Sequence, residues 1–378
     1  MKDSFSYSRD EISLFNAFSK LHFEGGLILP DDEIIKGTIS GEILNELQYS
    51  LKPLFLSLER ENGEKFQCIF GYVEDVFPVG YSGLQGNVHI CGISLGLIAL
   101  IDEFSKLIFS NNIFFQDIKG ISEEDFDKTL LSSTPVFNFV NDHILGKKPD
   151  NILSTGHIYP KNKFRMVASK ILFGFMMRFV WLHEIAHCTN GHVGFKNESN
   201  DNLLLDGAVS NSDNKSETTD NFWLEMDADT TALLMSCLDY VGNQEALSLE
   251  HPFDNDTLLR LNIFAVNAVI WIFEEFDKAG TIKNGPNHPI PQERIQNILR
   301  LVIYRINQTK GKHRISISKI TSDLSQLSIL SPNMPELEKI WMNVARDFVN
   351  QKFMKQEKEL NEYRTILKKW AYNKKSIK

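Results

Sequence analysis

The stretch WLHEIAHCTNGH, residues 181–192, constrains the fold most, because it places two histidines four residues apart inside a long apolar run. Residues four apart on a helix share one face, with their Cβ atoms about 5–6 Å apart. His183 and His187 can therefore direct two imidazoles at one metal ion, and zinc binds neutral imidazole nitrogen readily. Glu184 follows the first histidine and can act as general base for the water that such a metal activates.

An HExxH match also arises by chance, and two histidines on an apolar helix can simply belong to the core. A catalytic zinc of this kind needs a third protein ligand and an open fourth position. In the pattern HExxHxxGxxH a third histidine fills that role, but Asn190 and Val193 stand where glycine and histidine are required. That class of metallopeptidase is excluded, and we expect His192 to be a surface residue at the end of the helix.

A later helical segment, EMDAD at residues 225–229, supplies a better third ligand. Glu225 and Asp229 are again four residues apart and share a face. We expect Glu225 to complete the ligand set and Asp229 to hydrogen-bond the far nitrogen of a ligand histidine. The small Ala228 between them lets the two helices approach closely. An acidic cluster alone is usually solvated, so its place after the HExxH helix carries this prediction.

A third segment, NHPIPQERIQNIL at residues 287–299, contains a histidine before a proline-fixed turn and an arginine in the first turn of the next helix. His288 and Arg294 could hold a substrate carbonyl near zinc and stabilise its developing oxyanion. Taken alone, the segment would be interpreted as a loop histidine and a solvated arginine.

Together, the three segments resemble the signature of the glutamate-zincin (gluzincin) metallopeptidases, which is HExxH, then ExxAD, then HP followed by an arginine. The pattern is typical of the CAAX prenyl endopeptidase and HtpX-type family, and it covers residues 164–300, little over a third of this chain. The resemblance implies Zn²⁺ held by His183, His187 and Glu225, Glu184 as the catalytic base, Asp229 behind the ligands, and His288 with Arg294 on the substrate side.

Two features depart from that family: the chain lacks evident transmembrane helices and carries a polar, loop-like insert at residues 196–221. Both disfavour a membrane or prenylated substrate. Soluble bacterial families with similar motifs fit better, namely the phage-exclusion Lit peptidases, which cleave a host translation factor, and the ImmA/IrrE-type regulators. The resemblance thus implies a zinc endopeptidase acting on a protein or peptide, in phage defence or regulation.

The fold class follows from where strand-like and helical runs fall. FQCIFGYV at 66–73 and NVHIC at 87–91 have strand composition, whereas the chain from residue 164 has helical periodicity. We therefore predict an α+β, zincin-like fold with a mainly helical catalytic core and a small N-terminal sheet. A zincin usually pairs its substrate along a sheet edge, and NVHIC is our candidate for that edge.

The change from strand-like to helical segments along the chain predicts three regions. They are an N-terminal α/β accessory region at 1–150, a zinc metallopeptidase core at 151–305, and a C-terminal helical region at 306–378. The helix that carries EMDAD is expected to begin at Asp220 or Asn221.

Composition narrows the cellular setting. A net charge of −9 gives no reason to expect a nucleic acid partner. The first 15 residues lack the apolar region of a signal peptide, and four widely spaced cysteines indicate reduced thiols. The apolar runs at 88–101 and 261–273 are too short to cross a bilayer. We expect a cytoplasmic enzyme that does not associate with membranes.

Two other functions remain open. CGISLG contains GxSxG around Ser94 between a strand-like and a helical run, the local context of a serine-hydrolase nucleophile. The mainly helical chain that follows favours a simple strand-to-helix turn instead. The second alternative is a non-catalytic zinc-binding sensor module, although a purely structural site would have no use for the Glu184 carboxylate.

Overall fold

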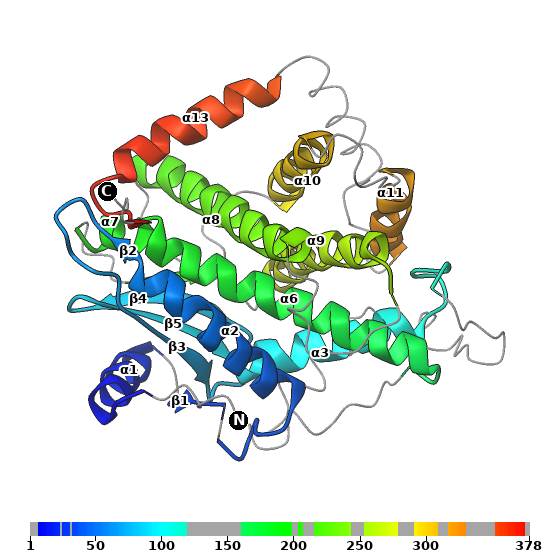
Figure 1. Ribbon diagram of the computed structural model, residues 1–378, viewed down its shortest axis with the longest axis horizontal. Helices are drawn as coiled ribbons and strands as arrows, with labels where there is room; N and C mark the ends of the chain where they lie inside the picture. The colour runs from blue at the N-terminus through cyan, green and yellow to red at the C-terminus, as the bar shows by residue number, and fades with distance from the viewer. Residues whose placement is uncertain are drawn as a thin grey trace.

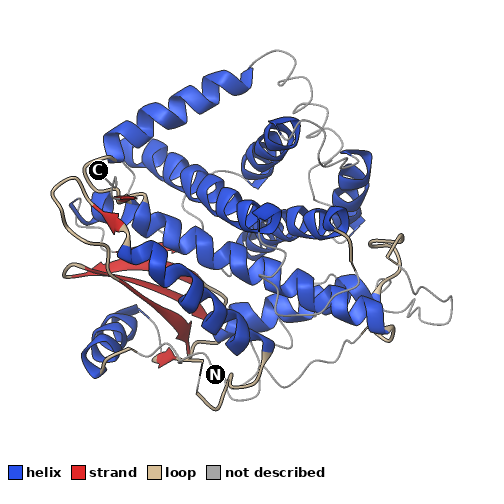
Figure 2. Cartoon of the chain, in the orientation of Figure 1, coloured by secondary structure: helices blue, strands red, loops and turns tan. Residues whose placement is uncertain are grey.

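The computed structural model is α+β and mostly helical, as predicted, with one mixed sheet beside a larger helical layer (Figures 1 and 2). It describes residues 7–22, 25–30, 32–118, 160–198, 203–206, 215–242, 253–278, 291–308, 317–329 and 352–374.

The sheet has five strands in the order β1-β3-β5-β4-β6. Strand β3 pairs parallel with β5, and the other neighbours are antiparallel. A two-residue turn joins β4 to β5, and Gly86 in that turn has a φ of 62°, a conformation that glycine adopts without strain. The strands are β1 (Leu27–Ile28), β3 (Cys68–Val73), β4 (Gly80–Gln85), β5 (Val88–Ser94) and β6 (Leu203–Asp206).

NVHIC is not an edge, so that prediction is wrong. Strand β5 lies at the centre of the sheet because the β4 hairpin takes one of its sides and the parallel pairing with β3 takes the other. The described part of the segment at 196–221 is not all loop: its apolar run Leu203–Asp206 forms β6, which pairs along β4. The following helix begins at Lys215, earlier than expected from its capping signals.

Side chains that follow one another along a strand point to opposite faces of the sheet, so each face packs into its own hydrophobic core. Phe70, Tyr72 and Ile93 point to the main core, together with residues of α2 (Ile39–Leu56), α3 (Leu95–Ser110) and α6 (Lys163–Thr189). The opposite face, which includes Ile69, Tyr81 and Ile90, is covered by α1 (Arg9–His22).

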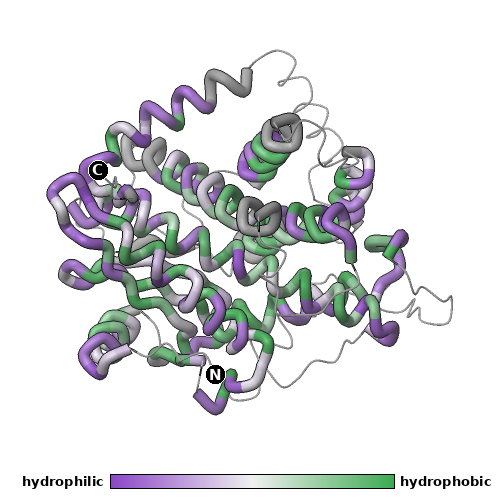
Figure 3. The backbone as a smooth tube through the Cα atoms, viewed as in Figure 1, coloured by the Kyte–Doolittle hydropathy of each residue, from purple (hydrophilic) through white to green (hydrophobic). Residues whose placement is uncertain are grey.

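Helix α6 runs through the middle of the molecule, between the sheet and the outer helices (Figure 1). Figure 3 shows the apolar segments gathered along this interface, whereas α13 on the outside is largely hydrophilic. The remaining elements are α7 (His192–Glu198), α8 (Lys215–Gly242), α9 (Asn255–Lys278), α10 (Pro291–Gln308), α11 (Ile317–Ser325), the 3-10 helix η4 (Gln326–Ile329), α13 (Lys352–Leu367) and the paired short strands β2 (Leu58–Glu59) and β7 (Asn373–Lys374).

Among the residues that the structure describes, two helices are long and apolar enough to cross a membrane, judged by length and composition alone: α6, and residues 255–273 of α9. The run at 261–273, which was expected to be too short to cross a bilayer, lies within a helix that is long enough. Within the most apolar windows, 72% and 83% of the residues are buried in the fold. Core helices of soluble proteins pass the same test, so this is weak evidence for a membrane span.

Three cysteines that are far apart in sequence meet behind α6. The Sγ atom of Cys91 lies 3.3 Å from that of Cys188 and 3.8 Å from that of Cys68, and all three are free thiols. Cys188 follows His187 directly, so the sheet packs against a side of α6 about 100° around the helix from that histidine.

Candidate metal centre

Helix α6 carries the HExxH segment in its last turns. The Asn162 side chain caps its start by accepting hydrogen bonds from the amides of Phe164 and Arg165. Its last residue is Thr189 and its C-cap is Asn190, and Gly191 follows with a φ of 88°, a left-handed conformation that suits glycine. The helix therefore stops where the chain turns at this glycine.

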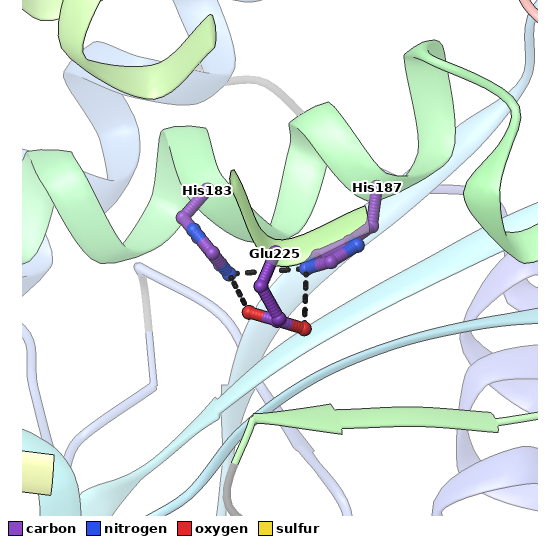
Figure 4. A group of neighbouring side chains, drawn as sticks. All are labelled: His183, His187 and Glu225. Carbon is purple, nitrogen blue, oxygen red and sulfur yellow. Dashed lines mark hydrogen bonds and ion pairs between the residues drawn. The ribbon is translucent and has the colours of Figure 1, made fainter. Parts of the chain in front are cut away.

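Three side chains from two helices converge beside α6, as Figure 4 shows. The Nε2 atoms of His183 and His187 lie 3.0 Å apart. Glu225 of α8 places Oε2 at 3.2 Å from the first nitrogen and Oε1 at 3.5 Å from the second. All three side chains are buried.

These separations suit a metal ion. Ligand atoms about 2.0–2.1 Å from a tetrahedral zinc lie about 3.3 Å from one another. The ligand atoms of His183, His187 and Glu225 all fall within 4.8 Å of each other, so the group could hold a metal ion. Two imidazoles and one carboxylate are a donor set that zinc accepts, and three protein ligands leave a fourth position open.

Asp229 lies behind the first histidine, as expected. Its Oδ1 is 3.0 Å from His183 Nδ1, and Arg294 donates two hydrogen bonds to the same carboxylate, at 2.7 and 2.8 Å. Burial alone would raise the pKa of Asp229, but the charge and hydrogen bonds of Arg294 prevail and lower it to about 2. Asp229 is therefore an anion that can accept a hydrogen bond from Nδ1–H of His183. This tautomer of His183 leaves Nε2 free to bind a metal.

Arg294 is thus placed differently from the sequence expectation. It is buried, it pairs with Asp229, and its Nη2 atom lies 3.9 Å from Glu225 Oε2. The other residue expected on the substrate side, His288, lies outside the described residues.

The prediction that His192 lies on the surface is wrong. The turn at Gly191 reverses the chain, and the first residue of α7 packs its ring back against α6, fully buried. Its Nδ1 atom lies 2.9 Å from His187 Nδ1, and its Nε2 atom lies 3.0 Å from Asp227 Oδ2. The second ligand histidine therefore has a buried imidazole behind it, where the first has a carboxylate.

Asp227 is a site residue that the sequence analysis missed. Its carboxylate also accepts a 2.9 Å hydrogen bond from Asn190 and a 2.6 Å hydrogen bond from Arg364 of α13. Burial would raise the pKa of Asp227, but His192 and Arg364 lower it to about 2. The sequence did contain a signal for Asp227. It is a third acidic residue, between Met226 and Ala228, and it lies off the helix face that Glu225 and Asp229 share, so a single solvated face does not account for it.

Glu184 lies against the sheet. Its side chain is buried, and a Cβ atom added at Gly80, the first residue of β4, would come within 2.6 Å of its Oε1. The carboxylate therefore fills the space that any other residue at position 80 would occupy. The glycine therefore leaves room for the carboxylate of Glu184, the residue next to His183 and the expected general base.

Ser94 occupies a structural position. Its Oγ accepts hydrogen bonds from the amides of Val79, at 3.0 Å, and Leu97, at 3.1 Å, and it caps the start of α3. Within the described part of the chain, these two amides are the hydrogen-bond partners of its hydroxyl group. The local geometry is that of a strand-to-helix turn.

Comparison with known proteins gives one match. Residues 147–309 match the sequence family described as Peptidase U49, and this range includes His183, Glu184, His187 and Glu225. The match supports a peptidase. No curated protein and no solved structure matches the chain significantly.

Proposed function

We propose that this chain is a zinc-dependent endopeptidase that hydrolyses a peptide bond in a protein substrate. The observation that carries the proposal is the convergence of His183, His187 and Glu225, with Glu184 beside them, inside the range that matches a peptidase family. A chance HExxH would not also have a buried carboxylate from a second helix within 3.5 Å of its histidines.

The three converging residues would hold the metal, with each histidine binding through Nε2. A bound Zn²⁺ would polarise the substrate carbonyl and make water a better nucleophile at neutral pH. The protein surroundings support this role, because the ligands are buried and the charge of Asp229 favours the tautomer of His183 that leaves Nε2 free.

Glu184 would move the proton. Its carboxylate takes a proton from the attacking water as general base, and the same group then donates that proton to the departing amine. Hydrolysis thus breaks the C–N bond, forms a C–O bond and leaves Glu184 ionised for the next cycle. Burial of the carboxylate against Gly80 supports this role, because it fixes the position of the base before substrate arrives.

The substrate is proposed by class only, as a protein or peptide. The suggested setting, a cytoplasmic peptidase of phage defence or regulation with no nucleic acid or membrane partner, rests on the motif resemblance and the composition. His288 is proposed to contact the substrate carbonyl, and Arg294 is proposed to hold Asp229.

The test compares the wild-type protein with Glu184→Gln, which keeps the shape of the side chain but removes the base. Both proteins are loaded with Zn²⁺, analysed for metal content and incubated with a peptide library, and new N termini are identified by mass spectrometry. We expect about one zinc per chain in both and new N termini from the wild type alone.

Equal cleavage by both proteins would contradict the role of Glu184. A wild-type protein that binds no zinc would contradict the metal centre. Zinc in both proteins with no cleavage by either would favour the sensor module, in which the site binds metal without turnover.

A further inference from the structure

An unbroken chain of side-chain contacts runs from the metal centre to helix α13. It passes from His187 to His192, from there to Asp227, and then to Arg364 of α13, with separations of 2.9, 3.0 and 2.6 Å. His192 is fully buried and Asp227 is 1% exposed, so water cannot replace either contact. Arg364 is 39% exposed and forms the outer end of the chain.

We infer that His192 is a positioning residue of the metal centre and that, through Asp227, it makes helix α13 a part of that centre. The inference rests on the proposed function, because it requires His187 to bind a metal. It assigns a role to residues in the region 352–374, which lies beyond the range that matches the peptidase family.

Metal binding at His187 would determine which nitrogen carries the proton in each of the two imidazoles. A histidine that binds a metal through Nε2 in its neutral form must carry its proton on Nδ1. His187 would therefore donate from Nδ1, and the atom that faces it, His192 Nδ1, must accept. With Nδ1 as acceptor, neutral His192 carries its proton on Nε2 and donates it to the Asp227 carboxylate. Metal binding thus fixes the tautomers of both rings.

The two ligand histidines are consequently supported in different ways. Asp229 accepts directly from His183, whereas His187 faces a neutral imidazole that is itself oriented by Asp227. An imidazole nitrogen fixes the ring orientation of His187 through one hydrogen bond but places no charge next to it. Removing this acceptor would leave a buried N–H donor without a partner whenever the metal is bound.

The C-terminal segment also holds the turn that carries His192. The amide of Tyr372 donates a 2.8 Å hydrogen bond to the carbonyl of Thr189, the last residue of α6. A Cβ atom at Gly191 would come within 2.6 Å of the backbone nitrogen of Ala371, so the segment packs directly on the turn. Arg60 anchors the segment in turn, since its Nε atom donates to the carbonyl of Trp370.

A matched pair of substitutions tests the role of His192. In His192→Asn, the side-chain oxygen can take the place of Nδ1 and accept from His187. In His192→Leu, nothing can accept. Both variants lose the contact to Asp227, so they should lose similar stability without metal. Zinc affinity is measured by competition with a chromogenic chelator, and the visible spectrum of the Co²⁺-loaded proteins reports the ligand geometry.

We expect the leucine variant to bind zinc about 10–100-fold more weakly than wild type, and the asparagine variant to bind within about threefold of it. The Co²⁺ spectrum should change in the leucine variant alone. A purely structural role would weaken both variants equally, in step with their loss of stability, and that result would overturn the inference.

The outer end of the chain is tested with Arg364→Gln, compared with Lys358→Gln on the same helix. Lys358 is 77% exposed and lies outside the chain of contacts. We expect zinc affinity to fall in the arginine variant and to remain at the wild-type level in the lysine variant.

Equal zinc affinities in these two variants would show that α13 does not contribute to the metal centre. That result would overturn the part of the inference that concerns α13. A wild-type protein that binds no zinc would instead contradict the proposed function, so the two failures are distinguishable. A wild type and a leucine variant that bind zinc equally tightly would overturn the role of His192 alone.

Discussion

The α-carbon of Gly80 lies directly against the carboxylate of Glu184, because a Cβ atom there would come within 2.6 Å of Oε1 and 3.3 Å of Cδ. Gly80 cannot shift easily, since it pairs with Ile93 of β5 on one side and with Asp206 of β6 on the other. The sheet therefore sets the position of the proposed catalytic base.

Gly80→Ala should consequently push the carboxylate aside without disturbing the metal ligands. A displacement of about 1 Å at a reacting group can lower the rate about 100-fold, so we expect turnover to fall by about that factor while zinc content stays at the wild-type level. Cleavage of a peptide selected from the library measures the effect. A matched control is Gly174→Ala on α6, whose Cβ would meet only Ile43, at 3.8 Å.

Gly174→Ala should keep wild-type turnover. Its free energy of unfolding should rise by up to about 1 kcal/mol, the usual difference between alanine and glycine inside a helix. Full activity in Gly80→Ala would show that catalysis does not require the Glu184 carboxylate to lie against the α-carbon of residue 80.

The pair formed by Arg294 and Asp229 gives a second prediction. Arg294→Met removes both hydrogen bonds to a fully buried carboxylate, and breaking such a buried pair costs about 3–5 kcal/mol. We expect a loss of unfolding free energy of this size in urea, together with weaker zinc binding, because Asp229 also orients His183. Arg294→Lys keeps the charge but loses the bidentate geometry. Its unfolding free energy and its zinc affinity should lie between those of the wild type and Arg294→Met.

The same variants separate two roles of the arginine. If Arg294 acted on the substrate, as the motif resemblance implies, the methionine variant would lose turnover while its zinc affinity and stability stayed near wild type. That outcome would contradict a role in holding Asp229.

The two pairs of candidate site residues were predictable because helical spacing determines each pair locally, and the order of the motifs along the chain predicted that the pairs would meet. His183 and His187 share a face whatever surrounds them, and Glu225 with Asp229 repeats that spacing on the next helix. The strands at 68–73 and 88–94 were predictable for a similar reason, since β-branched and aromatic residues cluster between turn signals.

The features that were missed depend on contacts between distant segments. Periodicity places NVHIC in a strand but does not say that strands will pair with both of its sides. The burial of His192 depends on the left-handed Gly191 and on a tail that packs against it, nearly 180 residues later in the chain. A single sequence gives no measure of such pairings, so Asp227 and Arg364 could not be recognised as neighbours.

The metal should also stabilise the fold, which gives a third prediction. A ligand that binds only the native state at 100 times its Kd adds about 2.7 kcal/mol. We expect Zn²⁺ to raise the Tm of the wild type, a chelator to reverse the rise, and Glu225→Ala to show little rise at the same zinc concentration. Glu33→Ala is the control, because Glu33 is 92% exposed and forms only a surface ion pair with Lys36.

The response of the control to zinc should match that of the wild type. An equal rise in Tm for Glu225→Ala and wild type would remove Glu225 from the ligand set. Differential scanning fluorimetry at a fixed protein concentration is sufficient for the comparison.

A fourth prediction concerns pH and a histidine outside the metal centre. Burial, with a smaller contribution from the charge of Arg60, lowers the pKa of His89 from 6.5 to about 3. Between these values the unfolded chain binds a proton at this residue and the folded chain does not, so stability is present above pH 6.5 and is lost as the pH falls toward 3. The loss amounts to about 1.4 kcal/mol per pH unit for one proton.

We therefore expect His89→Phe to lower the slope of unfolding free energy against pH by about one proton between pH 6 and 5. Urea unfolding with a chelator present measures this slope, because without metal the histidines of the centre contribute equally to both proteins. Tyr372→Phe is the matched control: it removes the hydroxyl 3.3 Å from His89 Nε2 but leaves the ring buried, so its slope should stay at the wild-type value. Equal slopes for His89→Phe and wild type would mean that this imidazole takes up its proton in the folded chain as readily as in the unfolded one.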